Sequence, residues 1–503
     1  MNLRFGSNRV KRGLIHFLIG KAVSALAGLL AVILVVQGLS VSDFAAYSIL
    51  IALVEVFTAF SGLGLSHVVL RYIPELYVSH RSVSLRFIIL STFAIRFCLL
   101  FAILFTAYMM IQPFGLILNL THVISSFELF LLVVILRSSS HFLSQILDST
   151  LHQGISQVVF SVSSIGRCVG ILWLFQTGQL DLFNLVALEA ICDAFACCFL
   201  ALGSIIVLRS VAEDKDPHID DLVWWPNHQK TVANFAMSAY LQHIATLPFG
   251  GNTNRLVGGV MFGDRVMANF GFAQSLYEYF KRYLPTQLLI GLIRPIVVAR
   301  FSVNRNFYAV TRLCDQALSI NIIIIFGAIS ILSVVGIELL TLVSDGKYGV
   351  ESLWLLISML ILLVLETQRL ILEVLTQTVE QYGLMIPGSF FLSASVLVGI
   401  SGYPFVGAIS FPVANALALF FANFWLFMKL KNLGYLYQHD WYLSKIIIIL
   451  FCTAVASGFV FKFMGANWVM SGCVTAAVYV VLFMKYLLKD SLSFVRDLVS
   501  APR

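Results

Sequence analysis

The sequence predicts an all-α integral membrane protein with about fourteen transmembrane helices. The chain has 503 residues, of which 59% are hydrophobic and 11% are charged. Charged residues make up about 25% of a soluble globular domain, so this composition excludes that class. The apolar residues fall into stretches of the ~20 residues that a helix needs to cross a bilayer. The cations gather in alternate connectors between these stretches, as in polytopic membrane proteins.

The apolar stretches set the expected order of spans along the chain. We expect spans at 13–38, 45–71, 87–111, 126–150, 157–177, 183–208, 233–250, 256–293, 313–335, 350–377, 383–400, 405–428, 445–463 and 468–487. The first stretch follows a basic start like that of a signal peptide, but Lys21 interrupts it and it continues to Val36, which predicts an uncleaved span. The eighth stretch is too long for one straight helix, and Pro285 is predicted to kink or end it.

The distribution of cations predicts the orientation in the membrane. One set of connectors holds Arg4, Arg9, Lys11, Arg12, Arg71, Arg81, Arg86, Arg209, Lys215, Lys230, Arg294, Arg300, Arg305, Arg312, Lys429, Lys431, Lys445, Lys485, Lys489, Arg496 and Arg503. The opposite set holds Arg255, Lys347 and Lys462. Because basic connectors stay in the cytoplasm, both termini are predicted to be cytoplasmic. The net charge of +7 then reflects topology and anionic lipid headgroups, and we expect no nucleic-acid partner.

The spacing of features along the chain predicts two halves. The polar segment 209–232 is predicted to be a cytoplasmic linker between an N-terminal lobe, 1–208, and a C-terminal lobe, 233–430, with a peripheral segment over 431–503. The separation from Asp43 to Pro74 equals that from Asp264 to Pro295. Six spans in each half give both lobes the same orientation, so we expect a parallel repeat with the substrate path between the lobes.

Two short elements resemble a known transporter family. Residues 39–47, LSVSDFAAY, lead to GLGL at 62–65 and RYIPE at 71–75, and NRLVG at 254–258 leads to ANFGFA at 268–273. These elements resemble the polysaccharide-synthesis flippases, the lipid-linked oligosaccharide or O-antigen exporters of the multidrug/oligosaccharidyl-lipid/polysaccharide (MOP) superfamily. Ala45 stands where that family commonly has glycine.

The resemblance implies a two-lobed, twelve-helix core around a central cavity, with two peripheral C-terminal helices. It implies export of an undecaprenyl-pyrophosphate-linked glycan, for lipopolysaccharide or exopolysaccharide, from the cytoplasmic to the outer leaflet of a bacterial inner membrane. The expected partners are this lipid-linked glycan, membrane lipids and other polysaccharide-assembly membrane proteins, and the expected working form is a monomer.

Cations inside the predicted spans indicate an anionic substrate. A buried cation costs ~2.5–3.5 kcal/mol on insertion scales, so it needs a partner or a wet cavity. Arginine can grip a phosphate through two parallel hydrogen bonds. The candidate substrate-binding residues are therefore Arg96, Arg137, Arg167, Arg265 and Lys21. The alternative is that Arg96, Arg137 and Arg167 pair with Glu55, Glu189 or Asp193 on neighbouring helices.

Acidic residues inside the spans have two interpretations. Glu189 and Asp193 lie four residues apart, on one helical face, and two close carboxylates raise one pKa, so with Glu55 they are candidates for ion or proton coupling. The alternative is that one of them pairs with Arg167. Arg369 lies three residues after Glu366 and four before Glu373, which predicts a structural ion network.

The sequence favours a transporter over an enzyme. It holds no glycine-rich phosphate loop, metal cluster or nucleophile motif, and the eight cysteines lie in apolar stretches without metal-type spacing, so we expect no cofactor, metal or disulfide. An ion-coupled exporter of small molecules would favour an acidic cavity. A glycan polymerase or ligase would need a charged outward surface. A scaffold for a synthase stays open as an added role.

Overall fold

The computed structural model describes residues 7–78, 81–118, 120–150, 152–212, 219–287, 297, 301, 306–379, 381–437 and 439–486. Within these ranges the regular structure is helical and no strand occurs. Eleven helical segments of the described chain are long and apolar enough to cross a membrane, and one of them, Met385–Asn432, holds two helices. The predicted all-α membrane class is confirmed.

The chain divides into two compact units. The first comprises Met1–Leu247 and Asn252–Ala268, and the second comprises Pro248–Gly251 and Asn269–Arg503. The helices numbered up to α11 are α1 (Ser7–Gly38), α2 (Val41–Gly62), α3 (Leu65–Val78), α4 (Ser82–Met109), α5 (Ile111–Ile117), α6 (Ile124–Ser149), α7 (Gln153–Gln176), α8 (Leu182–Ala212), α9 (Ile219–Thr246), α10 (Gly251–Met261) and α11 (Asp264–Arg282). The chain passes from the first unit to the second within α11.

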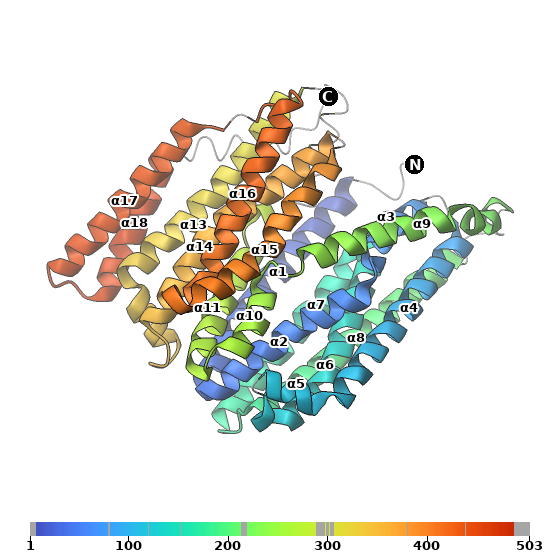
Figure 1. The fold of residues 1–503 in the computed structure, drawn as a ribbon, viewed down its shortest axis with the longest axis horizontal. Helices are drawn as coiled ribbons and strands as arrows, with labels where there is room; N and C mark the ends of the chain where they lie inside the picture. The colour runs from blue at the N-terminus through green and yellow to red at the C-terminus, as the bar shows by residue number, and fades with distance from the viewer. Residues whose placement is uncertain are drawn as a thin grey trace. The chain divides into compact units, whose positions relative to one another are not determined.

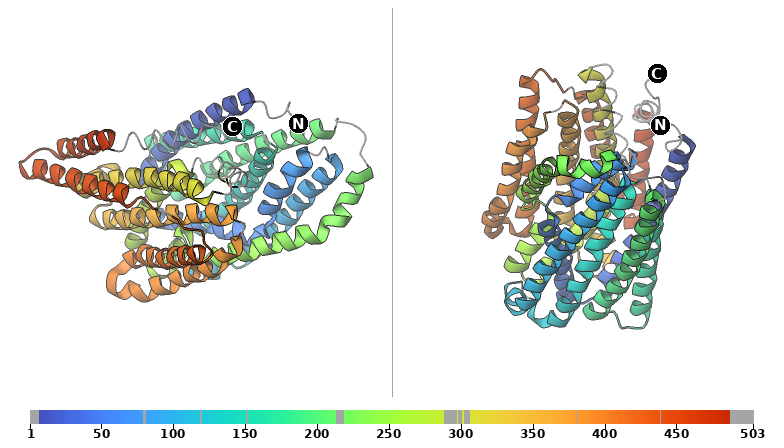
Figure 2. Two further views of the ribbon diagram at one scale, coloured as in Figure 1. Left: turned by 90° about the horizontal axis from the view of Figure 1, so that it is seen from above. Right: turned by 90° about the vertical axis from the view of Figure 1, so that its right-hand side faces the viewer.

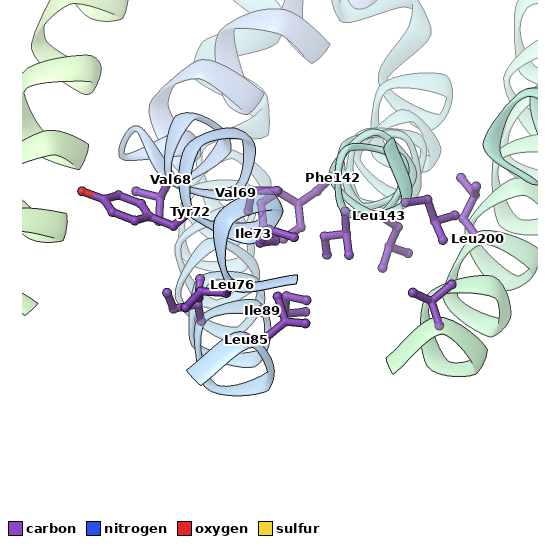
Figure 3. Close-up of a cluster of buried hydrophobic side chains, with 14 of the residues drawn as sticks. Val68, Val69, Tyr72, Ile73, Leu76, Leu85, Ile89, Phe142, Leu143 and Leu200 are labelled. Carbon is purple, nitrogen blue, oxygen red and sulfur yellow. The ribbon is translucent and has the colours of Figure 1, made fainter. Parts of the chain in front are cut away.

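Helices of the first unit pack through large apolar side chains. Helix α6 lies against α8, α1 against α7 and α3 against α4. Figure 3 shows a buried cluster in which α3 contributes Val69 and Ile73, α4 contributes Leu85, and α6 contributes Phe142. Lipid is as apolar as these side chains, so close van der Waals packing is what holds the helices together. This packing positions the polar side chains of α4, α6, α7 and α8.

The second predicted span, 45–71, is broken into two helices. Ser40 begins α2 by accepting a hydrogen bond from the Asp43 backbone N–H at 3.1 Å. The helix ends where Leu63 and Gly64 take the left-handed conformation, with φ values of 40° and 70°. A Cβ at Gly64 would overlap the backbone carbonyl oxygen of Ala236 in α9. Glycine is therefore required at position 64 for two reasons: its φ is positive, and the backbone of α9 lies too close for a side chain.

The segment 209–232, predicted to be a linker, is largely helical. Helix α8 continues to Ala212 and α9 begins at Ile219, while residues 213–218 lie outside the described residues. The buried Trp224 meets the Tyr72 ring edge-on, with centroids 6.0 Å apart. The Trp225 ring lies 4.9 Å from that of Phe87. The predicted span 233–250 includes the second half of α9, and the prediction missed its first part, 219–232, whose tryptophans pack on α3 and α4.

The predicted seventh and eighth spans, 233–250 and 256–293, differ from the structure in their boundaries. Helix α10 covers the predicted break, and α11 begins at Asp264. Arg255, counted in the sequence as an outward loop cation, lies within α10 and is 1% exposed. Asp264 lies in the first turn of α11, as Asp43 does in α2, where an acidic side chain is favourable. Pro285 follows the end of α11.

The second unit continues with three helical hairpins. Their helices are α13 (Phe307–Val343), α14 (Val350–Thr378), α15 (Met385–Val406), α16 (Ser410–Asn432), α17 (Trp441–Phe463) and α18 (Trp468–Tyr486). Helices α17 and α18 lie side by side in Figure 1 and in the left view of Figure 2, and they pack on α13. Lys462 of α17 forms an ion pair with Glu338 of α13 at 2.6 Å, and the Tyr479 hydroxyl of α18 donates to the Ile323 carbonyl oxygen at 2.6 Å.

Candidate functional site

Four helices of the first unit bring charged and polar side chains together inside the bundle. Helix α2 contributes Tyr47, α6 contributes Arg137, α7 contributes Arg167, and α8 contributes Glu189 and Asp193. The two acids lie one helical turn apart, so both face the same neighbours. Helix α8 packs on both α6 and α7, which places the two arginines against these acids. We call these five residues the first-unit charge cluster.

Every member of the cluster has a polar partner in it. The Arg137 guanidinium donates from Nη2 to Glu189 Oε2 at 2.7 Å and from Nε to Asp193 Oδ2 at 2.9 Å. Arg167 Nη2 donates to Asp193 Oδ1 at 3.0 Å. The Tyr47 hydroxyl donates to Glu189 Oε1 at 2.5 Å. Asp193 therefore holds both arginines, whereas Glu189 holds Arg137 and the tyrosine.

The cluster has equal numbers of positive and negative side chains, but its arginines are more exposed than its acids. Two guanidinium groups face two carboxylates, which compensates for the cost of burying each charge. The side chains of Glu189 and Asp193 are 2% and 8% exposed, while those of Arg137 and Arg167 are 16% and 28% exposed. The arginines thus form the more exposed side of the cluster. Arg167 Nε itself is buried and has no hydrogen-bond partner among the described residues.

Arg96 is a buried cation of a different kind. It lies in α4 and is 6% exposed. Its guanidinium donates to Ser66 Oγ at 2.8 Å and Ser138 Oγ at 3.3 Å, and it lies 4.9 Å from the centre of the Phe142 ring. No carboxylate pairs with it in the described part of the chain, and its Nε has no partner there. Arg96 is therefore a buried positive charge that only neutral groups solvate.

The remaining candidates of the first unit occupy other environments. Lys21 is half-buried in α1, and its ammonium interacts electrostatically with Asp148 of α6. Arg265 is exposed in the first turn of α11, and Glu55 is exposed on α2. Neither Arg265 nor Glu55 is buried as the cluster residues are. Sequence reasoning named Glu189 and Asp193 as alternative partners of the arginines, and the structure forms those pairs.

The three residues of the ion network predicted in α14, Glu366, Arg369 and Glu373, have polar contacts with other residues. Glu366 forms an ion pair with Lys281 of α11 at 2.5 Å. Arg369 Nη2 donates to the Met385 carbonyl oxygen at 3.4 Å, and Glu373 Oε1 accepts from Gln377 Nε2 at 3.2 Å. The contact with Lys281 could not be found from spacing within one helix, because α11 is distant in sequence.

A second polar group, outside the predicted sites, joins α13 to the connector before α17. Asp315 Oδ1 accepts from the Tyr437 hydroxyl at 2.7 Å and lies 2.7 Å from His439 Nδ1, while Oδ2 accepts from the Asp440 backbone N–H at 3.1 Å. His439 Nε2 lies 2.7 Å from Ser444 Oγ. The hydrogen bond to the Asp315 carboxylate raises the pKa of His439 above its ordinary value of 6.5.

Sequence reasoning missed two residues of the first unit. Tyr47 belongs to the element that carries the family resemblance, yet its hydroxyl was not assigned a role. Arg255 was assigned to a loop because α10 follows directly on a predicted span end. Helix α10 contains a cation, two asparagines and three glycines. Its mean hydropathy is therefore too low for the helix to be recognised as a membrane span.

Comparisons with known proteins place the fold. No model of a known protein family matches the chain, and no curated protein matches it in sequence. The chain is similar to the solved structure of the lipid II flippase MurJ in an inward closed conformation, with a TM-score of 0.59 and 14% identity over 96% of this chain and 100% of that one. It is also similar to an inward-facing multidrug resistance MATE family transporter of the MOP superfamily, with a TM-score of 0.61 and 13% identity over 82% of this chain and 95% of that one.

At these identities the likeness establishes the fold. The chain has the fold of MOP superfamily transporters, and it is a multi-pass membrane protein. The resemblance to the polysaccharide flippases within that superfamily stays a prediction.

Proposed function

We propose that the protein is a flippase that moves an undecaprenyl-pyrophosphate-linked oligosaccharide or polysaccharide repeat unit from the cytoplasmic to the outer leaflet of the bacterial inner membrane. Its fold resembles that of a lipid II flippase over nearly the whole chain, which supports a transporter of lipid-linked substrates. The observation that carries the proposal is Arg96, a 6% exposed cation with no carboxylate partner among the described residues. Such a charge is suited to an anionic ligand.

The substrate needs this kind of group to cross the membrane. Moving an unpaired pyrophosphate into hydrocarbon costs at least several kcal/mol, so a headgroup without a protein does not cross at a useful rate. An arginine supplies a permanent charge and two parallel donors that match phosphate oxygens. Arg96 would hold the headgroup together with the accessible donors of Arg137 and Arg167, while Lys21 and Arg265 are candidates for later contacts along the path.

The proposed transport cycle is alternating access. The lipid tail stays in the bilayer while the charged headgroup occupies a hydrated path, and the two lobes predicted from the sequence rock to expose it first to the cytoplasm and then outward. In this proposal both termini are cytoplasmic, the working form is a monomer, and neighbouring polysaccharide-assembly proteins supply and collect the lipid-linked glycan.

The alternative is an ion-coupled exporter of small molecules, which the likeness to a MATE transporter keeps in view. A cationic substrate would need an uncompensated acid inside the bundle. Among the described residues of the first unit the two buried acids, Glu189 and Asp193, already pair with two arginines. The buried charge of Arg96 then favours an anion, and flux of a cationic dye by the purified protein would support the alternative instead.

The proposal is tested with purified protein in liposomes that contain a fluorescent polyprenyl-pyrophosphate-linked sugar. Arrival of the label at the opposite leaflet is measured by quenching from that side. We expect Arg96→Ala to abolish transport, and Arg96→Lys to retain part of it if charge alone matters. Arg71→Ala is the matched control, because the Arg71 side chain is 62% exposed on α3. Wild-type transport by the Arg96→Ala, Arg137→Ala, Arg167→Ala and Arg265→Ala variants would overturn the cationic-path proposal.

A further inference from the structure

We infer that the break between α2 and α3 builds an anion-binding site around Arg96, in which the first turn of α3 and the hydroxyl groups of Ser66 and Ser138 bind the same phosphate group as the arginine. This inference rests on the proposed function and deepens it, because it assigns further binding residues to the pyrophosphate headgroup. All of these residues belong to the first unit.

The break places the start of a helix beside a buried cation. Helix α3 begins at Leu65, inside the apolar run that the sequence predicts as one span. In its first turn Ser66 Oγ accepts a hydrogen bond from Arg96 Nη1 at 2.8 Å. The start of a helix carries about half a positive charge, and Arg96 adds a full one that no carboxylate compensates among the described residues. An anion at this position would therefore be attracted by both.

The first turn of α3 offers backbone N–H groups to an anion. The residue before the helix is Gly64, which has no side chain that could cap it. The Gly64 carbonyl oxygen accepts from the His67 and Val68 N–H groups at 3.0 and 3.2 Å. The N–H groups of Leu65 and Ser66 precede these bonds, as the opening N–H groups of a helix do. Such groups bind phosphates at the starts of other helices.

The two serine hydroxyls around Arg96 are unused donors. Ser66 and Ser138 accept from the guanidinium at 2.8 and 3.3 Å, and neither donates to another group among the described residues. A helical serine commonly donates to a carbonyl oxygen three or four residues back, as Ser140 does to Leu136 at 2.8 Å in the same helix as Ser138. The O–H groups of Ser66 and Ser138 thus remain available for an acceptor such as a phosphate oxygen.

The neighbours of Arg96 fix its orientation without neutralising its charge. Its two Nη atoms bind the serines, and its guanidinium lies 4.9 Å from the centre of the Phe142 ring. Its Nε is buried and has no hydrogen-bond partner in the described part of the chain. The arginine therefore keeps both charge and hydrogen-bonding capacity that the protein does not use. A carboxylate in place of a serine would remove its attraction for an anion.

Ser66 lies on the accessible side of this site. Ser138 is 1% exposed and the Phe142 ring is 0% exposed, whereas Ser66 is partly exposed. An anion would therefore meet the Ser66 hydroxyl and the first turn of α3 before it contacts the guanidinium.

The site also accounts for the strained backbone at the break. Leu63 has a φ of 40°, a conformation that is unfavourable for a residue with a side chain. An uninterrupted helix would avoid this strain, but it would have no helix start beside Arg96. Strained residues of this kind persist where the surrounding structure and function require them.

The test is calorimetric binding of farnesyl pyrophosphate to the full chain in lipid nanodiscs. Ser66→Ala should bind about tenfold more weakly, because a hydrogen bond to a charged ligand is lost. Ser66→Thr, which keeps the hydroxyl, should restore most of the affinity. Ser61→Ala is the matched control and should bind as the wild type, because this buried serine of α2 donates to the Thr58 carbonyl oxygen at 3.1 Å.

Ser66→Asp separates binding from stability. The new carboxylate would pair with Arg96 and would lie in the first turn of α3, where an acid is favourable. We therefore expect an unchanged or higher unfolding midpoint together with loss of farnesyl pyrophosphate binding. A purely structural role of Ser66 predicts instead that a stable variant binds as the wild type does.

A second measurement needs no variant. Hydrogen exchange of the wild-type protein, resolved at the N–H groups of Leu65 and Ser66, should slow when farnesyl pyrophosphate is added. Farnesol, which has the same chain without the phosphates, should leave the exchange unchanged.

The outcomes separate this inference from the proposed function. Wild-type affinity in Ser66→Ala or Ser66→Asp, an equal loss in Ser61→Ala, or exchange at both N–H groups that the pyrophosphate does not slow would overturn the inference. The flippase proposal would still stand if the wild type binds farnesyl pyrophosphate and Arg96→Ala abolishes transport. Absence of binding by the wild type would overturn both.

Discussion

Replacing Arg137 by alanine should destabilise the first unit strongly. The variant loses the hydrogen bonds to Glu189 at 2.7 Å and to Asp193 at 2.9 Å, and it leaves two buried acids facing the single cation of Arg167. Breaking a buried ion pair by removing one partner costs about 3–5 kcal/mol, because the other charge is left uncompensated. We therefore expect the free energy of unfolding to fall by that amount in a denaturant titration of the purified protein in mixed micelles.

A double variant separates the charge effect from the loss of packing. Arg137→Ala combined with Glu189→Ala leaves Arg167 and Asp193 as a balanced pair. The double variant should therefore lose less stability than the sum of the single variants, by about 1–3 kcal/mol. Arg96→Ala is the comparison variant. It also removes a cation from inside the first unit, but it leaves no acid without its partner. Additive effects in the double variant, or a loss below about 1 kcal/mol in Arg137→Ala, would refute the reasoning.

Two further predictions concern other parts of the fold. Gly64→Ala should lower the free energy of unfolding by about 1–2 kcal/mol because of its left-handed φ, and by more because the new Cβ overlaps α9. Gly62→Ala is the control and should be neutral or stabilising, because the space around its Cβ position is open. Equal unfolding midpoints of the two variants would contradict this prediction. Because the hydrogen bond to Asp315 raises the pKa of His439, that interaction stabilises the fold fully below pH 6.5 and is lost as pH rises through the raised pKa. Hydrogen exchange of the Asp440 amide, corrected for its intrinsic rate, should show protection falling over that range, and Asp315→Asn should remove the dependence on pH.

Much of the fold could be predicted because the bilayer imposes a length on each helix. The spans expected at 157–177 and 350–377 match α7 and α14 to within a few residues. The breaks inside spans could not be predicted in the same way. The end of α2 at Leu63 and Gly64 lies within an apolar run, and its left-handed backbone depends on how closely α9 approaches. The first part of α9, before residue 233, was missed because Trp224 and Trp225 pack through tertiary contacts that composition does not report.

The candidate site could be predicted as a set of residues but not as a set of contacts. Arg96, Arg137 and Arg167 were recognised because cations within apolar stretches are costly. Whether each would pair with an acid depends on the rotation of its helix about its own axis, which hydropathy does not determine. Arg137 and Arg167 turn to α8, while Arg96 turns to serines and a phenylalanine.

The ion pairs between α6 and α8 also constrain how the chain enters the membrane during synthesis. Arg137 emerges from the ribosome 56 residues before Asp193, so its partner does not yet exist when α6 reaches the bilayer. Each of these charges costs ~2.5–3.5 kcal/mol on insertion scales if its helix moves into lipid alone. Helices α6 and α7 should therefore remain beside the insertion machinery until α8 arrives, and the three should leave together. A nascent chain that stops before α8 is expected to stay crosslinked to that machinery, whereas one that includes α8 is expected to be released.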